Sequence, residues 1–485
     1  MVSTIYLFLL SFVLAQFSTN VHVYSRVQEK CHTHHEPDQF RVAINGPNTV
    51  SISWRTMVRY NQYDHSALPK VQYNTNTSVE YGTIVIGNTY TYMDPIVDIY
   101  VSWFHTVVLN VSSSTKYYYM ILAAKCIDAS NIYSFTSQVA AGNSSRINIT
   151  IIGDVGYDGI NGKRQIFNDT VTALLNVSNS TNFYLHVGDI SYADDTDVHQ
   201  IGQNYEDKWN GYQTAMQVLT AENIYMTAPG NHEATCTQFS DCLCEEFDHK
   251  TRQSRNFAAY LNRFSMPGGD SNMTYKNMWY SFDYGLAHIV VINTETDFPG
   301  APAGPHTTLN AGDFAPNGTQ LKWLDADLRD ARNRSCEVPW IIVAGHRPWY
   351  GSVPKYLSDF QIQSDNCDTC REAFAGIIFN HTVDFYFSGH VHWYERLFPV
   401  DQNGQKLADN YTEPAGPIYI TTGAGGAPEG YQTMNIKANA SAVQNSTYGF
   451  SQLQIFNSSY AELYFYDSSD SVQLDNIAIT RNHTC

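Results

Sequence analysis

Apolar runs in the middle of the chain each end at a glycine that leads into polar residues. Five runs are rich in Val, Ile, Tyr and Phe: INITII (147–152), FYLHV (183–187), IYMTAP (224–229), WIIVA (340–344) and DFYFS (384–388). Runs of this length that stop at glycine predict buried strands ending in tight turns. Helical patterns lie between them, at 161–175 and at 320–332, and this alternation predicts an α/β domain.

The segment before residue 140 carries a different pattern. Short alternating or apolar runs are separated by turn residues, at 49–54, 70–75, 105–111, 116–124 and 131–138. This spacing predicts an all-β sandwich of the immunoglobulin or fibronectin type III kind over 31–140. A linker of small residues leads into the α/β domain over 145–417. Strand-like runs from Ile418 onward are expected to complete that domain over 418–485.

Polar motifs follow all five strand ends of the α/β domain. They read Gly153-Asp154, Gly188-Asp189-Ile190-Ser191-Tyr192, Gly230-Asn231-His232-Glu233, Gly345-His346 and Gly389-His390-Val391-His392. Ligands of open α/β sheets bind beyond the carboxyl ends of the strands. We therefore expect one converging site with seven potential metal ligands: Asp154, Asp189, Tyr192, Asn231, His346, His390 and His392.

The type and number of these ligands favour two transition-metal ions. Mixed oxygen and nitrogen donors suit Fe, Mn or Zn better than Ca or Mg, which prefer oxygen alone. Seven ligands exceed what one catalytic ion takes while it keeps an open position. They divide into two sets of four if one carboxylate bridges, and Asp189 is the expected bridge. Two cations about 3.5–4 Å apart clamp the attacking and leaving oxygens of a phosphoryl displacement, so the pattern indicates a metal-dependent hydrolase.

Net charge limits the partners of this site. The chain of 485 residues has a formal net charge of -18 and no basic run, which argues against a nucleic-acid polymer as a partner. A phosphate-bearing substrate must then be attracted by local positive charge, such as bound metal ions.

The N-terminus has the pattern of a signal peptide over residues 1–15, with cleavage expected after Ala15. A membrane anchor is the alternative, but a span needs about 20 apolar residues and this run is shorter. We therefore expect a protein that is secreted or luminal, without a membrane partner. Sixteen Asn-x-Ser/Thr sequons predict a glycosylated surface: Asn76, Asn110, Asn143, Asn148, Asn168, Asn176, Asn179, Asn272, Asn317, Asn333, Asn380, Asn410, Asn439, Asn445, Asn457 and Asn482.

Nine cysteines in an oxidising compartment predict disulfide bonds. Cys31 and Cys126 are candidates for one pair. An odd total leaves at least one thiol free or intermolecular, which permits a disulfide-linked homodimer. Cys367-Asp-Thr-Cys370 has the alternative interpretation of half a zinc site.

The order of the seven ligands resembles the calcineurin-like metallophosphoesterase superfamily. Two positions make the chain similar to the purple acid phosphatases within it. Gly156 stands where most of the superfamily carries a metal-binding His, and Tyr192 would supply a phenolate in its place. The stretches 191–194, 347–350 and 392–396 agree. The resemblance covers nearly the whole mature chain and is strongest to the long plant and fungal members.

This resemblance implies a two-sheet sandwich core with flanking helices and an acid phosphatase that hydrolyses phosphate monoesters. It implies Fe(III) held by Asp154, Asp189, Tyr192 and His392, and Zn(II), Mn(II) or Fe(II) held by Asp189, Asn231, His346 and His390. A metal-bound hydroxide is the implied nucleophile. Asn231 and His232 would contact the substrate, and His232 would protonate the leaving alkoxide. Asp194 and Glu233 would lie behind them, with Glu233 orienting His232, while Glu395 and Arg396 would form a structural ion pair.

One departure from the family concerns the leaving-group side of the site. Plant members often carry an adjacent His pair after the ligand that matches His346, where this chain has Lys355 and Tyr356. Lys355, Tyr356 and His306 are the candidates to replace that pair. Small phosphate monoesters are the expected substrates, with phytate and nucleotides among the candidates. Two other functions remain open from the sequence: a phosphodiesterase or nucleotide pyrophosphatase on the same core, and a catalytically silent secreted binding glycoprotein.

Overall fold

The computed structural model describes most of the chain beyond residue 34. The described residues are 35–59, 63, 68–92, 100–124, 127–157, 164–195, 203–234, 256–267, 277–302, 314–316, 318–354 and 366–483. The expected signal peptide lies outside them, as do Cys31, Cys126, His306, Lys355 and Tyr356. Within the described ranges, no helix is both long enough and apolar enough to cross a membrane.

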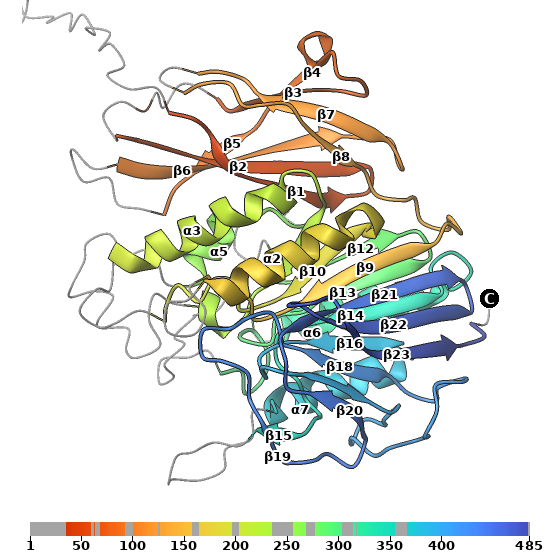
Figure 1. Ribbon diagram of the computed structural model, residues 1–485. Helices are drawn as coiled ribbons and strands as arrows, with labels where there is room; N and C mark the ends of the chain where they lie inside the picture. Colours follow the sequence, from red (N-terminus) through yellow and green to blue (C-terminus); the bar gives the residue numbers. More distant parts are fainter. Residues whose placement is uncertain are drawn as a thin grey trace, which may run out of the picture. The chain divides into compact units, whose positions relative to one another are not determined.

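Two antiparallel four-stranded sheets form the N-terminal part of the described chain (Figure 1). One has the order β1 (Asp38–Gly46), β2 (Thr49–Arg59), β6 (Tyr100–Asn110), β5 (Asn88–Tyr90), and the other β4 (Thr83–Ile86), β3 (Lys70–Asn74), β7 (Lys116–Ile121), β8 (Tyr133–Thr136). A short 3-10 turn, η2 (Val79–Tyr81), joins β3 to β4. Ile52 and Trp54 from the first sheet are buried with Tyr119 and Phe135 from the second, so the predicted all-β sandwich is confirmed.

Two larger mixed sheets form the core of the α/β domain. The six-stranded sheet has the order β11 (Tyr225–Ala228), β10 (Phe183–Val187), β9 (Ile147–Ile152), β21 (Gly449–Asn457), β22 (Tyr460–Asp467), β23 (Gln473–Thr480). The seven-stranded sheet has the order β12 (Tyr280–Tyr284), β13 (Ala287–Val291), β14 (Trp340–Ala344), β16 (Phe385–Ser388), β18 (Ile418–Thr422), β17 (Tyr394–Leu397), β20 (Ser441–Asn445). The C-terminal segment therefore adds strands to both sheets. A two-stranded ribbon pairs β15 (Val353–Pro354) with β19 (Met434–Ile436).

The alternation along β14 explains why its sequence is apolar throughout. Trp340 and Ile342 face the core that the two sheets share, whereas Ile341 and Val343 face a second core. The second core is closed by the helices α6 (Thr319–Asn333) and α7 (Asp368–Asn380). Because successive side chains of a strand point to opposite faces, a strand covered on both sides must be apolar at every position.

Helices also cover the six-stranded sheet. The helix α2 (Gln165–Val177) contacts β10 where the Tyr184 hydroxyl donates to the Leu174 carbonyl at 2.8 Å. The helix α3 (Gln203–Thr220) reaches the same strand through Tyr212 and His186. Shorter turns are η4 (Ser178–Ser180), η5 (Asn231–Glu233) and α5 (Ala258–Arg263). The predicted two-sheet sandwich with flanking helices is confirmed, and the two helices expected at 161–175 and 320–332 correspond to α2 and α6.

The cysteines of the CxxC motif are joined to each other. Cys367 and Cys370 form a disulfide bond at the start of α7, so the interpretation of this motif as half a zinc site is wrong. Cys336 is disulfide-bonded as well.

Candidate metal centre

Three of the expected ligands converge on one point between the two sheets. Asp154 follows β9, Tyr192 follows β10, and His392 follows β16. The Tyr192 hydroxyl donates to Asp154 Oδ1 at 3.2 Å and lies 2.8 Å from His392 Nε2. All three side chains are buried, with at most 4% of each residue exposed.

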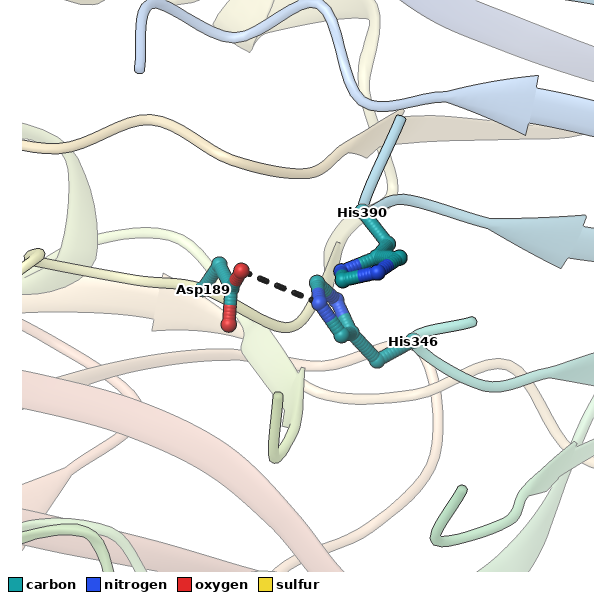
Figure 2. Close-up of side chains that lie close together, drawn as sticks. All are labelled: Asp189, His346 and His390. Atoms are coloured by element: carbon teal, nitrogen blue, oxygen red, sulfur yellow. Dashed lines mark ion pairs between the residues drawn. The ribbon is translucent and has the colours of Figure 1, made fainter. Parts of the chain in front are cut away.

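The other four expected ligands also lie close together, and Figure 2 shows three of them, Asp189, His346 and His390. His346 Nε2 lies 3.0 Å from Asp189 Oδ2 and 3.1 Å from Asn231 Oδ1. His390 offers a ring nitrogen within 4.8 Å of the ligand atoms of Asp189 and His346. The backbone N–H of His390 also donates to both carboxylate oxygens of Asp154, at 3.1 and 2.9 Å, which connects the two groups.

The imidazole tautomers fit metal binding. His346 Nδ1 donates to the Val187 carbonyl at 2.9 Å, and His392 Nδ1 donates to the Gly430 carbonyl at 2.9 Å. A carbonyl oxygen can only accept, so the proton on Nδ1 is fixed and Nε2 is directed at the site. Together with carboxylate, amide and phenol oxygens, these nitrogens form the mixed donor set that Fe, Mn or Zn prefers.

Electrostatics between the ligands also fit a cation. Burial alone would lower the pKa of His346, but Asp189 raises it to about 9. Burial would raise the pKa of Asp189, yet His346 and His232 hold it well below its usual range. Burial and then Asp154 raise the pKa of Tyr192 well above its ordinary value. A phenolate at this position therefore needs a metal ion to replace its proton.

The backbone around the site is strained in a way that the sequence did not reveal. Four of the seven expected ligands have left-handed φ values: Asp154 (58°), Asp189 (53°), Tyr192 (53°) and His390 (67°). Such conformations cost on the order of 1–3 kcal/mol each for non-glycine residues and cluster at functional sites. The strain indicates that the strand-end turns are held in place to aim these four side chains.

Two glycines of the motifs are explained by the same packing. Gly188 has φ 89°, and a Cβ there would lie 2.5 Å from Nδ1 of His346. Gly156 has φ 65°, and a Cβ there would lie 2.6 Å from Pro428 and 3.3 Å from the Tyr192 ring. The Tyr192 ring therefore packs against Gly156, the position at which most of the resembled superfamily was expected to carry a metal-binding His.

His232 lies beside the site with one ring nitrogen fixed. Its Nδ1 is 2.8 Å from Asp194 Oδ1, and its Nε2 is 3.8 Å from Asp189 Oδ2. The ring leans against Tyr192, with centroids 4.0 Å apart. Burial would lower the pKa of His232, but Asp194 and Asp189 raise it well above its ordinary value.

Glu233 has a different role from the one expected. Its carboxylate accepts from the backbone N–H groups of Asp189, Ile190 and Gly230, at 2.9, 2.9 and 2.8 Å. The side chain that orients His232 is therefore Asp194, while Glu233 ties two ligand-bearing turns together.

The expected ion pair between Glu395 and Arg396 is also wrong. Arg396 pairs with Asp475, at 2.7 and 2.9 Å, and Glu395 accepts from the backbone N–H of Ser352 at 2.8 Å. Neighbouring residues on a strand point to opposite faces, so these two side chains separate.

The sequence did not predict a role in this site for Arg347 or Glu295. Arg347 Nε lies 2.9 and 3.0 Å from the two oxygens of Glu295, and Arg347 NH1 lies 3.0 Å from His390 Nε2. Arg347 directly follows His346 in the sequence, which was the available signal. Glu295 had none, because it lies in a loop after β13 with no motif around it.

Comparisons with known proteins agree with this geometry. Residues 147–394 match the family described as calcineurin-like phosphoesterase, and residues 416–476 match one described as iron/zinc purple acid phosphatase-like protein C. The chain is 30% identical over 500 residues to acid phosphatase A of Cryphonectria parasitica, and 27% identical over 463 residues to mouse acid phosphatase type 7. Each alignment covers 92% of both chains.

A solved structure has a similar fold. The purple acid phosphatase from yellow lupin seeds superposes with a TM-score of 0.71 at 21% identity, and the match covers 93% of this chain and 75% of that one. The two-sheet fold and the converging donor set define a metallophosphoesterase, and the chain belongs to the calcineurin-like phosphoesterase family. Within that family it is an acid phosphatase, and its C-terminal part matches the iron/zinc purple acid phosphatase model.

Proposed function

We propose that this acid phosphatase works with two metal ions, one at each group of ligands. Asp154, Asp189, Tyr192 and His392 would hold Fe(III), and Asp189, Asn231, His346 and His390 would hold Zn(II), Mn(II) or Fe(II). One observation carries the proposal: His346 Nε2 lies 3.0 Å from Asp189 Oδ2 and 3.1 Å from Asn231 Oδ1. His346 follows a strand of the seven-stranded sheet, whereas Asp189 and Asn231 follow strands of the six-stranded sheet. When bound, the ions supply positive charge for the phosphate oxygens and make water a better nucleophile near neutral pH.

His232 would deliver the proton that the leaving alkoxide needs. Asp194 holds Nδ1 at 2.8 Å, which leaves Nε2 as the atom that faces the site. A general acid whose second nitrogen is fixed by a carboxylate keeps its orientation during proton transfer. Asn231 would contact the phosphate beside His232. Glu233 accepts from the backbone N–H groups of Asp189 and Gly230, which would keep Asn231 and His232 at a fixed position relative to Asp189.

We propose small phosphate monoesters as substrates, with phytate and nucleotides among the candidates, and a secreted or luminal glycoprotein as the mature form. Exposure of the sequons supports the glycoprotein. Fourteen of the sixteen sequon asparagines are described; twelve are exposed, Asn445 is half-buried and Asn148 is buried. Exposed asparagines are accessible to glycosylation, which requires a surface position.

Metal analysis combined with two substrates tests this proposal. The purified protein should contain two metal equivalents, iron among them, and should hydrolyse an aryl phosphate monoester faster than the matching diester at acidic pH. Protein without bound metal, or with a preference for the diester, would contradict the proposal.

A further inference from the structure

Arg347 is held rigidly at the edge of the candidate metal centre. Its backbone N–H donates to Thr294 Oγ1 at 3.0 Å, and its carbonyl accepts from the Tyr386 hydroxyl at 2.8 Å. Its Nε contacts both oxygens of Glu295, a residue with no exposed surface. A buried carboxylate needs a positive partner, so the guanidinium is fixed in place by Glu295 on one side.

The other side of the same guanidinium reaches the metal ligands. Arg347 NH1 donates to His390 Nε2 at 3.0 Å, and 17% of the arginine side chain is exposed. The described residues thus place a fixed cation at the boundary between His390 and solvent. The chain as a whole carries a charge of -18, so a local cation here would attract a phosphate that the rest of the protein repels.

Metal binding to His390 removes the acceptor of this hydrogen bond. A neutral imidazole has one protonated and one unprotonated nitrogen. A metal ion on Nε2 would take the lone pair that Arg347 uses. A metal ion on Nδ1 would require the ring proton to be on Nε2, which then cannot accept. In both cases the NH1 donor of Arg347 becomes free, while Glu295 still holds Nε.

We propose that Arg347 binds a non-bridging oxygen of the substrate phosphoryl group and favours the dianion of a monoester over the monoanion of a diester. This inference rests on the proposed function. The guanidinium is always charged and presents several N–H donors in a plane, a geometry that matches phosphate oxygens. Glu295 is a positioning residue, because it touches the guanidinium and not the substrate.

The test compares Arg347→Gln and Arg347→Lys with a matched control, Arg334→Gln, whose arginine pairs with Asp283 at 2.7 Å. The metal-loaded proteins are titrated with inorganic phosphate by calorimetry, and KM and kcat are measured for an aryl monoester and diester. We expect Arg347→Gln to weaken phosphate binding and raise the monoester KM about 10- to 100-fold, the range for hydrogen bonds to charged groups. Lys should give a smaller loss, the diester a smaller effect, and the control no change.

Arg347→Gln leaves Glu295 buried without its partner, so a double variant, Arg347→Gln with Glu295→Gln, removes that charge. It should regain stability without regaining phosphate affinity. Unchanged phosphate affinity in both variants would overturn the assignment. Loss of a metal equivalent in parallel with phosphate affinity would also overturn it, since Arg347 would then act through His390. Absence of monoester turnover in the wild type would instead refute the proposed function, and the calorimetric titration would still test Arg347.

Discussion

The hydroxyl of Tyr192 lies 2.8 Å from Nε2 of His392, although the two residues are 200 positions apart in the chain. Tyr192 follows a strand of the six-stranded sheet and His392 follows a strand of the seven-stranded sheet. Their contact therefore depends on the packing of the two sheets against each other. The site is a product of the whole sandwich and not of any single motif.

Removing a ligand of the second group should release one metal ion. We expect Asn231→Ala and His346→Ala each to bind one metal equivalent fewer than the wild type and to lose nearly all turnover, since a missing donor leaves an incomplete ligand set. Elemental analysis of the purified variants measures this loss. His381→Ala is the matched control, because His381 pairs with Asp325 at the end of α7 and should leave both metals bound. Retention of both metals by His346→Ala would refute the ligand assignment.

The loss of kcat on replacing His232 should depend on the leaving group of the substrate. General acid catalysis contributes about 10²- to 10⁴-fold, so His232→Gln should lower kcat by about that factor for an alkyl phosphate. A nitrophenyl phosphate needs little protonation of its leaving group and should lose much less. Asp194→Asn should give the same pattern with a smaller loss, because His232 stays in place but loses the carboxylate that orients it and raises its pKa. An equal loss for both substrates would exclude His232 as the proton donor.

His288 should make the stability of the fold depend on pH. Its two ring nitrogens lie 2.6 Å from Asp283 and 3.0 Å from Asp327. Burial would lower the pKa of His288, but the two carboxylates raise it to about 9. Because this folded-state pKa exceeds the unfolded value of about 6.5, the stabilisation is fully present below about pH 6.5 and is lost as the pH rises through about 9.

Urea unfolding of the wild type and His288→Gln measures this effect. The difference in the free energy of unfolding should be at most about 3 kcal/mol at low pH, from the size of the pKa shift, and should shrink as the pH rises. A difference that does not vary with pH would show that the charge on His288 is not the cause.

We expect exposed sequon asparagines to carry glycans and buried ones to carry none. Asn148 is 6% exposed on β9, which lies between β10 and β21, so Asn148→Gln should leave the glycan mass of the purified protein unchanged. Asn457 is exposed at the end of β21, and Asn457→Gln should reduce the mass by one glycan. Mass spectrometry before and after deglycosylation decides, and a glycan found on Asn148 would contradict the burial of this strand.

The strand ends and the ligand motifs could be predicted from the sequence because their signals are local. A buried strand such as β14 needs apolar residues at every position and a glycine where its chain turns. The metal ligand that directly follows such a strand therefore lies at the carboxyl end of the sheet.

The side-chain pairs that could not be predicted from the sequence are contacts between residues far apart in the chain. Arg347 meets Glu295 across 52 residues, and Arg396 meets Asp475 across 79. No local pattern encodes such pairs. The left-handed backbone at Asp189 and His390 was not predicted either, because Asp and His adopt this conformation only at some positions and the surrounding packing decides which.

The visible absorption spectrum of the metal-loaded protein tests the central claim most directly. Tyr192 bound to Fe(III) should give a charge-transfer band between phenolate and iron, measured alongside the iron content of the same sample. The account predicts a coloured wild-type protein and the loss of this band in Tyr192→Phe. An iron-containing wild type without a visible band, or a Tyr192→Phe variant with the wild-type spectrum, would contradict it.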